Sequence, residues 1–171
     1  MDLWIFAYGS LMTKPTFDYV ERIPATLLGH SRNFCILSNV WRGTPEKPGL
    51  VVGLVPGNQC QGFAFRIAPA NHAAALAATD QVELIRDVYH RKTVPLSLAD
   101  GRRVEGQAYV ANLDSAEFRD YSPEEKIAMI STAAGRNGTS AQYLSDLRAR
   151  LQELSILDEE VETLYRLIFK E

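Results

Sequence analysis

Glu83 is a candidate general base. It follows an alanine-rich stretch and precedes a predicted strand, and junctions of this kind supply many catalytic groups. Its neighbours Val82, Leu84 and Ile85 are apolar, so we expect partial burial of the carboxyl group. Burial disfavours the charged form and raises the pKa of a carboxyl group, which makes it a better base near neutral pH. The alternative is a solvated surface glutamate.

The segment Tyr8-Gly9-Ser10-Leu11 could bind an anion with its backbone. It ends an apolar, aromatic-rich run, and a Gly-Ser step leaving a strand can turn successive N–H groups toward one point. Such a cradle binds a carboxylate or the oxyanion of a tetrahedral intermediate. The alternative is an ordinary turn at the end of a strand.

The segment Arg42–Gly49, with the sequence RGTPEKPG, reads as a rigid loop that presents a guanidinium group. Its two prolines and two glycines are too many for a helix or a central strand. Arginine can clamp a carboxylate through two parallel hydrogen bonds, so Arg42 is a candidate for substrate binding. A purely structural, solvated loop is the alternative.

Metal and cofactor motifs do not occur in the sequence. It has no Gly-rich nucleotide-binding pattern, no H-E-x-x-H and no C-x-x-C, and His30, His72 and His90 lack the spacing of metal ligands. We therefore expect neither a metal nor a cofactor. Cys35 and Cys60 do not make a disulfide framework, which favours free thiols in a reducing compartment and hence a cytoplasmic protein.

Length and composition limit the remaining classes. The chain has 171 residues, 46% of them hydrophobic, and a formal net charge of −3. This length predicts one domain over residues 1–171. The charge argues against nucleic-acid binding, and no apolar run approaches the roughly 20 residues of a membrane span. The first ten residues lack the basic region and cleavage site of a secretory signal. The oligomeric state is left open.

The elements that must position these residues fall into two groups. The first two-thirds of the chain has the short apolar runs and turn signals of strands. Pro56-Gly57-Asn58 and Ala99-Asp100-Gly101 are the turn signals, each expected to join two strands. The expected strands are Leu3–Tyr8, Thr26–Leu28, Phe34–Leu37, Leu50–Val55, Gly62–Ile67, Thr93–Leu98 and Val104–Val110.

Helices are expected at Pro69–Asp80 and throughout the last third. Ser122 begins one with a capping box, and Gly135 should close it. A second runs from about Ser140 to Leu154, and Asp158 caps a third. Strands followed by helices predict an α+β fold with a small, curled or barrel-like mixed sheet flanked by helices.

Taken together, these segments resemble the ChaC-like γ-glutamylcyclotransferase family. The resemblance rests on YGSL at 8–11, on RGTPEKPG at 42–49, and on a glutamate, Glu83, six positions before a tyrosine, Tyr89. The Ala-Ala-Gly and Gln142-Tyr143-Leu144 segments of the helical part also look like the family. The similarity covers roughly residues 3 to 157, and the eight-residue loop is its most specific part.

The resemblance implies a lyase of glutathione catabolism that releases 5-oxoproline and Cys-Gly. The substrate's own α-amine would attack its γ-carbonyl, with Glu83 as general acid and base and with no cofactor. The N–H groups of Gly9, Ser10 and Leu11 would hold either the substrate's anionic group or the oxyanion. Contacts from other side chains to the substrate are expected at Tyr8, Tyr89, Tyr143 and, for the glycyl carboxylate, Arg42.

Two departures from the family leave the substrate open. The family commonly has arginine before the glutamate and glycine two positions before the tyrosine, where this chain has Val82 and Asp87. The Asp87 carboxylate could raise the pKa of Glu83. Alternatives are a cyclotransferase for other γ-glutamyl amines or amino acids, a non-catalytic γ-glutamyl-peptide-binding protein, and a thiol amidase using Cys35 or Cys60.

Overall fold

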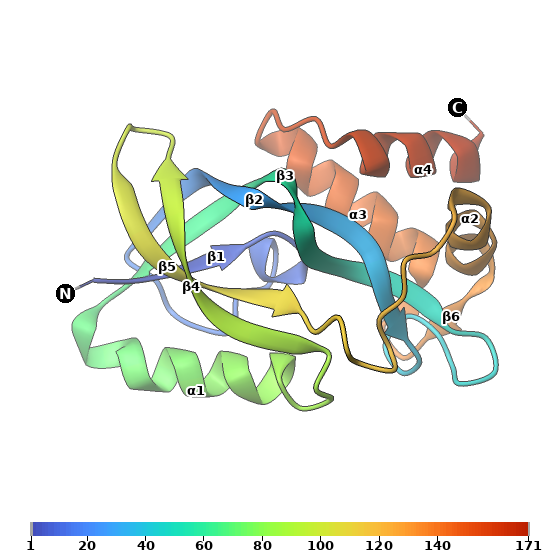
Figure 1. Cartoon of the computed structure of the whole chain (residues 1–171), viewed down its shortest axis with the longest axis horizontal. Coiled ribbons are helices and arrows are strands. Elements are labelled where there is room, and N and C mark those ends of the chain that lie inside the picture. Colours follow the sequence, from blue (N-terminus) through green and yellow to red (C-terminus); the bar gives the residue numbers. More distant parts are fainter. Residues whose placement is uncertain (1, 171) are drawn as a thin grey trace. The chain divides into compact units, whose positions relative to one another are not determined.

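A mixed sheet closed into a barrel is the central feature of the computed structural model, which describes residues 2–170. Its strands are β1 (Leu3–Ala7), β2 (Glu21–Ser38), β3 (Gly49–Ile67), β4 (Tyr89–Leu98) and β5 (Arg103–Ala111). They follow one another around the barrel in the order β1-β3-β2-β4-β5 (Figure 1). β1 runs antiparallel to β3 and parallel to β5, so the sheet is mixed. The predicted α+β fold with a barrel-like mixed sheet is confirmed.

The chain forms two compact units. The first combines the chain up to Arg32 with Leu54–Ser115, and the second combines Asn33–Gly53 with the chain from Ala116 onward. The first unit contains β1, β4 and β5, and the helices of the C-terminal third belong to the second. The prediction of one domain over residues 1–171 stays a prediction.

The first unit shows one predicted hairpin and one displaced helix. β4 and β5 pair antiparallel from Tyr89 opposite Ala111 to Ser97 opposite Arg103, and Gly101 turns the chain between them at φ 92°. A 3-10 turn at Pro69–Asn71 precedes helix α1, which spans His72–Glu83. The helix therefore begins and ends three residues later than expected. Glu83 is its last residue.

The expected turn at Pro56-Gly57-Asn58 is wrong, because β3 passes through it without a break. Gly57 lies against Ser31 of β2, where a Cβ atom would be 2.1 Å from Ser31 Oγ. The same hydroxyl oxygen accepts a hydrogen bond of 3.0 Å from the N–H of Asn58. The glycine thus permits close approach of two strands. The short strands expected on either side of residue 30 are likewise parts of one strand, β2.

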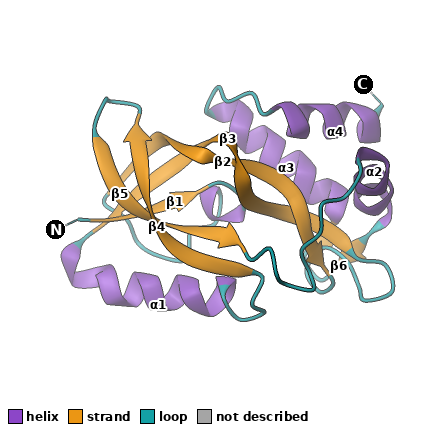
Figure 2. Cartoon of the chain, viewed as in Figure 1, coloured by secondary structure: helices purple, strands orange, loops and turns teal. Residues whose placement is uncertain are grey.

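The second unit contains three helices that pack against one another, α2 (Pro123–Thr132), α3 (Ser140–Glu153) and α4 (Glu159–Phe169) (Figure 2). Their predicted starts are confirmed. Ser122 and Glu125 form the capping box of α2, and Asp158 accepts a hydrogen bond from the N–H of Val161 at the start of α4. The buried side chains that form the packed faces include Ile130, Leu144, Leu147, Leu151, Val161 and Leu164.

Gly135 does not close α2, contrary to expectation, since that helix ends at Thr132. It belongs instead to β6 (Ala134–Gly135), which pairs with β7 (Gly138–Thr139). A Cβ atom on Gly135 would lie 2.6 Å from the backbone nitrogen of Gly43. The glycine therefore lets the chain pass against the RGTPEKPG loop. Among the described residues, no helix is long and apolar enough to cross a membrane.

Candidate active site

The segment Tyr8–Leu11 leaves the end of β1 and enters a short 3-10 helix, Ser10–Met12. The first hydrogen bond inside this helix runs from the N–H of Met12 to the carbonyl of Gly9, at 3.0 Å. The N–H groups of Gly9, Ser10 and Leu11 come before that bond and are not used by it. The segment thus has the backbone donors that the predicted anion cradle requires.

Tyr8 is buried, and its hydroxyl group is used within the barrel. The hydroxyl donates a hydrogen bond of 2.5 Å to the carbonyl of Tyr109 on β5. The carbonyl of Tyr8 accepts a hydrogen bond of 2.8 Å from Nε of Arg32. Both ends of this residue are therefore held in place. A contact between Tyr8 and a substrate stays a prediction.

Glu83 is half-buried at the end of α1. Removal from water raises the pKa of its carboxyl group from 4.5 to about 7. Of the neighbours expected to cover it, Val82 is 58% exposed and Ile85 is 76% exposed, whereas Leu84 is half-buried. The exposed Val82 and Ile85 side chains therefore contribute little to the burial of this carboxyl group.

Tyr109 connects α1 with the end of β1. Its carbonyl accepts the hydrogen bond from Tyr8, and its hydroxyl donates a hydrogen bond of 2.7 Å to Oδ1 of Asp80. Asp80 also pairs with Nε of Arg91, at 3.1 Å. Burial, the Asp80 carboxylate and, to a smaller degree, Glu83 raise the pKa of the Tyr109 hydroxyl. One residue of β5 thus contacts the Tyr8 side chain and the helical turn that ends in Glu83.

The turn after Glu83 is held by Asn112. The side-chain amide of Asn112 donates to the carbonyl of Asp87, and its backbone N–H donates to the carbonyl of Val88, both at 2.8 Å. Asp87 has a φ of 56°, a left-handed conformation in which glycine is the least strained residue. Burial accounts for the raised pKa of Glu83 without a contribution from Asp87. Tyr89 follows as the first residue of β4 and is half-buried.

Arg42 and Tyr143 belong to the second unit and contact each other. The guanidinium group of Arg42 lies 5.6 Å from the centre of the Tyr143 ring, and its Nη1 donates to the carbonyl of Thr139 at 3.3 Å. The Tyr143 hydroxyl accepts a hydrogen bond of 3.3 Å from the N–H of Val52. These contacts fasten the RGTPEKPG loop to the start of α3. Substrate contacts by Arg42 and Tyr143 stay predictions.

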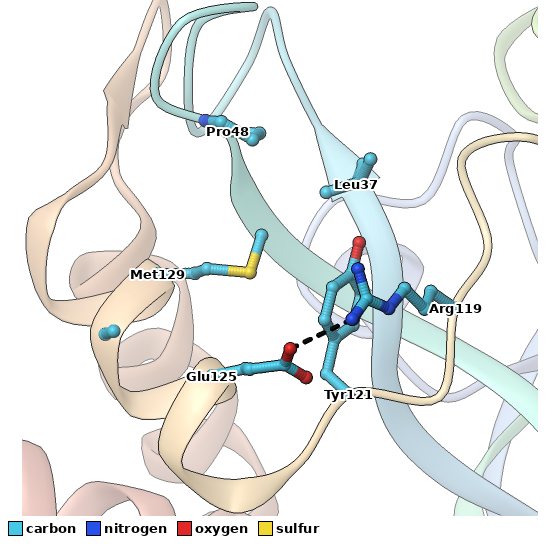
Figure 3. A pocket seen from close by; sticks show the side chains of 7 residues that line it. Leu37, Pro48, Arg119, Tyr121, Glu125 and Met129 are labelled. Carbon is cyan, nitrogen blue, oxygen red and sulfur yellow. Dashed lines mark hydrogen bonds and ion pairs between the residues drawn. The ribbon is translucent and has the colours of Figure 1, made fainter.

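A cavity of about 440 Å³ lies in the second unit. It is mainly apolar, and two of its lining residues, Arg119 and Glu125, form an ion pair of 2.9 Å (Figure 3). None of the predicted site residues lines this cavity. The residues that line the cavity and are labelled in Figure 3 are Leu37, Pro48, Arg119, Tyr121, Glu125 and Met129.

Sequence reasoning missed Arg32, Tyr109 and Asn112 because their contacts join residues far apart in the chain. The separation is 24 positions between Arg32 and Tyr8 and 101 between Tyr109 and Tyr8. Asp80 could have been found, because it precedes Glu83 by three positions and so lies on the same side of a helix. Within residues 2–170, no group of three or more His, Cys, Asp and Glu side chains could hold a metal ion.

Comparison with known proteins finds one family along nearly the whole chain. The family model described as ChaC-like protein matches residues 3–171. A glutathione-specific γ-glutamylcyclotransferase of Escherichia coli is 33% identical over 158 residues, which cover 92% of this chain and 68% of that protein. The enzyme of the same name from Saccharomyces cerevisiae is 46% identical, with 92% of this chain and 88% of that protein covered.

Solved structures agree on the fold. The crystal structure of the yeast γ-glutamylcyclotransferase specific to glutathione matches with a TM-score of 0.90 at 22% identity, and it covers 99% of this chain and 96% of that one. A structure named γ-glutamyl cyclotransferase matches with a TM-score of 0.58 at 16% identity, covering 96% and 86% of the two chains. At these identities the matches show a shared fold.

Proposed function

The chain belongs to the ChaC-like family, and from this premise we propose that it is a γ-glutamylcyclotransferase that cleaves glutathione into 5-oxoproline and Cys-Gly. The observation that supports the chemistry is Glu83, a half-buried carboxyl group with a pKa of about 7. Glu83 is the last residue of α1, and Tyr109 connects this helix to Tyr8 through hydrogen bonds. Tyr8 is the first residue of the proposed backbone cradle. A base and an anion-binding segment are the two groups that this reaction needs.

Ring closure uses a nucleophile that the substrate already carries. The α-amine of the γ-glutamyl group attacks the γ-carbonyl carbon, a new C–N bond closes the five-membered ring, and the carbonyl oxygen becomes an oxyanion. The original amide C–N bond then breaks, and its nitrogen leaves with the cysteinyl part. Holding the amine against the carbonyl contributes an effective molarity worth about 7–11 kcal/mol in well-oriented cases.

Glu83 moves the protons that these steps require. A free α-amino group has a pKa near ~8, so most of the substrate is ammonium at neutral pH and cannot attack. Transfer of its proton to a carboxylate with a pKa of about 7 costs only about 1.4 kcal/mol. The same transfer to a carboxylate with the ordinary pKa of 4.5 would cost about 5 kcal/mol. Glu83 then passes a proton to the leaving nitrogen.

The backbone cradle supplies electrostatic stabilisation in this proposal. The N–H groups of Gly9, Ser10 and Leu11 donate either to an anionic group of the substrate or to the oxyanion. Both assignments use the same three donors. Tyr8, Tyr89 and Tyr143 are proposed to contact the γ-glutamyl group.

Purified Glu83→Gln tests the base. The amide keeps the shape of the side chain and cannot take a proton, so we expect a loss of about 10²–10⁴-fold in 5-oxoproline formation from glutathione. The matched control is Glu105→Gln, which changes an exposed glutamate on β5 and should keep wild-type activity. Wild-type rates in the Glu83→Gln enzyme would overturn the assignment of the base.

Other γ-glutamyl compounds are the main alternative substrates. A panel of γ-glutamyl amines and γ-glutamyl amino acids, assayed for 5-oxoproline, separates these substrates from glutathione. Binding of glutathione without any turnover would instead indicate a γ-glutamyl-peptide-binding protein. The Glu83 environment favours catalysis over binding alone, because binding of the substrate's ammonium group needs only a carboxylate with an ordinary pKa, whereas the raised pKa of Glu83 lowers the cost of taking the proton.

A thiol amidase is disfavoured by the state of the cysteines. Burial raises the pKa of the Cys35 thiol to about 12, and Cys60 is 2% exposed. A thiol with so high a pKa supplies almost no thiolate at neutral pH. Cys35→Ser and Cys60→Ser variants test this alternative, and both should keep the wild-type rate of 5-oxoproline formation. Loss of activity in either variant would support a thiol amidase.

We also propose a cytoplasmic location and a single domain over residues 1–171. The two cysteines are both free thiols, which suits a reducing compartment, and the proposed substrate is itself a thiol. β2 and β3 each contain residues of both units without a break, which supports one cooperative domain. A single transition in thermal unfolding, seen equally by near- and far-ultraviolet circular dichroism, checks this proposal.

A further inference from the structure

Arg32 is a buried cation beside the segment proposed to bind the substrate. It lies on β2 and is only 6% exposed. Its Nε donates a hydrogen bond of 2.8 Å to the carbonyl of Tyr8, and its Nη2 donates one of 2.5 Å to the carbonyl of Gln61 on β3. Burying a guanidinium group costs free energy unless its donors are used, so these two bonds tie the ends of neighbouring strands to one rigid fork.

The bond to Tyr8 orients the first donor of the cradle. No cis peptide bond occurs between residues 2 and 170, so the peptide that joins Tyr8 to Gly9 is trans and planar. In a trans peptide the carbonyl and the N–H group point in opposite directions. Because the Tyr8 carbonyl points to Arg32, the N–H of Gly9 points away from Arg32. The direction of that donor is thus coupled to the hydrogen bond between Arg32 and Tyr8.

The bond to Gln61 anchors the guanidinium group against a closely packed part of the barrel. Gly62 follows Gln61, and a Cβ atom there would lie 2.2 Å from the carbonyl oxygen of Ala7. β3 therefore approaches the end of β1 as closely as its backbone allows. A change in the guanidinium group should therefore move the Tyr8–Gly9 peptide relative to β3, because β3 is packed too closely against β1 to move with it.

We propose that Arg32 is a positioning residue that aims the Gly9 N–H at the reacting γ-glutamyl group. The inference rests on the proposed function, since it names what orients the donors of that site. This role of Arg32 requires the planar guanidinium group with its two fixed donor directions, and a positive charge alone is not sufficient. Lysine keeps the charge but cannot donate to both carbonyls in the fixed geometry of a guanidinium group.

The experiment compares Arg32→Lys and Arg32→Met with the wild type. The direct readout is the Kd for 5-oxoproline, measured calorimetrically, because the product keeps both the carboxylate and the former γ-carbonyl oxygen that the cradle could hold. We expect both variants to bind 5-oxoproline at least tenfold more weakly and to lose at least tenfold in kcat/KM for glutathione. The matched control is Arg66→Lys, since Arg66 lies on β3 and pairs with Glu21, away from Tyr8.

An Arg32→Lys protein with the wild-type melting temperature and the wild-type Kd would overturn the proposal, because the charge alone would then suffice. A purely structural role predicts a lower melting temperature and less active protein, with an unchanged Kd in the folded fraction. That outcome also overturns it. If the wild-type protein makes no 5-oxoproline from any γ-glutamyl compound, the proposed function fails independently of the Arg32 result.

The wild-type protein gives a second test that does not depend on folding of the variants. Nuclear magnetic resonance follows the Gly9 amide and the Arg32 Nε–H during titration with 5-oxoproline. We expect both signals to shift with the same Kd, because a ligand on the Gly9 N–H polarises the peptide whose carbonyl Arg32 holds. Saturation with 5-oxoproline that leaves both signals unchanged would contradict the inference.

Discussion

The hydroxyl of Tyr109 donates a hydrogen bond of 2.7 Å to Oδ1 of Asp80, one helical turn before Glu83. This bond joins β5 to the end of α1, where the proposed base lies. Since the carbonyl of Tyr109 also accepts the Tyr8 hydroxyl, the base and the cradle share a common support. The position of Glu83 should therefore depend on the Tyr109 side chain.

Tyr109→Phe tests this dependence. The variant leaves the buried ring in place and removes only the bond to Asp80. A hydrogen bond to a charged group contributes about 1.5–3 kcal/mol, so we expect the free energy of unfolding to fall by about 1–2 kcal/mol. We also expect kcat to fall several-fold with little change in KM, because Glu83 is displaced and the cradle is not. Steady-state kinetics and urea unfolding measure the two effects.

Tyr19→Phe is the matched control, because the Tyr19 ring packs on Phe65 and the residue is 42% exposed. It removes a hydroxyl without touching α1, so neither kcat nor the free energy of unfolding should change. If Tyr109→Phe behaved like this control, the bond to Asp80 would have no part in positioning the base.

The sequence predicted elements well where the determining contacts are local. The capping box at Ser122, the cap at Asp158 and the turn at Gly101 depend on residues within a few positions of each other. Gly57 shows the opposite case. Its turn-like neighbours belong to a strand because Ser31, 26 positions earlier, packs against it. Nothing near Gly57 in the sequence indicates that partner.

The residues of the candidate site also fall into two groups, those that the sequence alone could predict and those that only the structure shows. Glu83 and the YGSL segment carry their chemistry in their own residue types, and a family resemblance singles them out. Arg32 and Tyr109 act through backbone carbonyls, which have no sequence signature because every residue has one. A closed barrel brings such groups together only after its strands have paired. Sequence reasoning can therefore predict the reacting groups earlier than it can predict their supports.

A partly buried ion pair should stabilise the helical unit without affecting the chemistry. Nζ of Lys126 pairs with Oε1 of Glu160 and donates a hydrogen bond of 3.0 Å to Asn33, and the N–H of Phe34 donates to Oε2 of Glu160. Lys126 is 6% exposed. Glu160→Gln leaves that cation without a negative partner, so we expect a loss of about 3–5 kcal/mol in the free energy of unfolding.

Urea unfolding measures this loss, and the KM for glutathione should stay at the wild-type value in the protein that remains folded. The double variant Lys126→Met with Glu160→Met removes both charges and should recover most of the stability, because no isolated charge is left in the interior. A Glu160→Gln protein as stable as the wild type would show that the pair contributes nothing.

Asp87 offers a test of backbone strain next to the base. At φ 56° an aspartate is tolerated, a glycine is unstrained and a β-branched residue is strongly disfavoured. We expect Asp87→Gly to change the free energy of unfolding by less than about 1 kcal/mol, because relief of strain offsets the greater freedom of the unfolded chain. Asp87→Val should lose more than about 1 kcal/mol and lower kcat. Equal stability of the Gly and Val variants would show that this conformation carries no strain.

The pH dependence of the reaction should report Glu83. The carboxylate is the form that accepts a proton, and its pKa in the free enzyme is about 7. We therefore expect kcat/KM to fall tenfold per pH unit below about pH 7, instead of below about pH 4.5 as for an ordinary glutamate. Initial rates from pH 5 to pH 8 in a constant-ionic-strength buffer give the midpoint. A rate that stays constant down to pH 5 would contradict the raised pKa.

The same burial should make stability depend on pH in the opposite sense to activity. The pKa of Glu83 is higher in the folded protein than in the unfolded chain, so the native state binds the proton more tightly. The proton on Glu83 contributes up to about 3 kcal/mol to the free energy of unfolding. This contribution is complete below about pH 4.5 and is lost as the pH rises through about 7. Glu83→Gln cannot ionise and should not lose it.

The difference in the free energy of unfolding between Glu83→Gln and the wild type should therefore move in favour of the variant between pH 5 and pH 8. Urea unfolding at several pH values measures it, and Glu105→Gln again serves as the exposed control. A variant that is inactive yet increasingly more stable than the wild type at higher pH is the signature of a buried base. A difference that does not change with pH would mean that the Glu83 carboxyl is as well hydrated in the folded protein as in the unfolded chain.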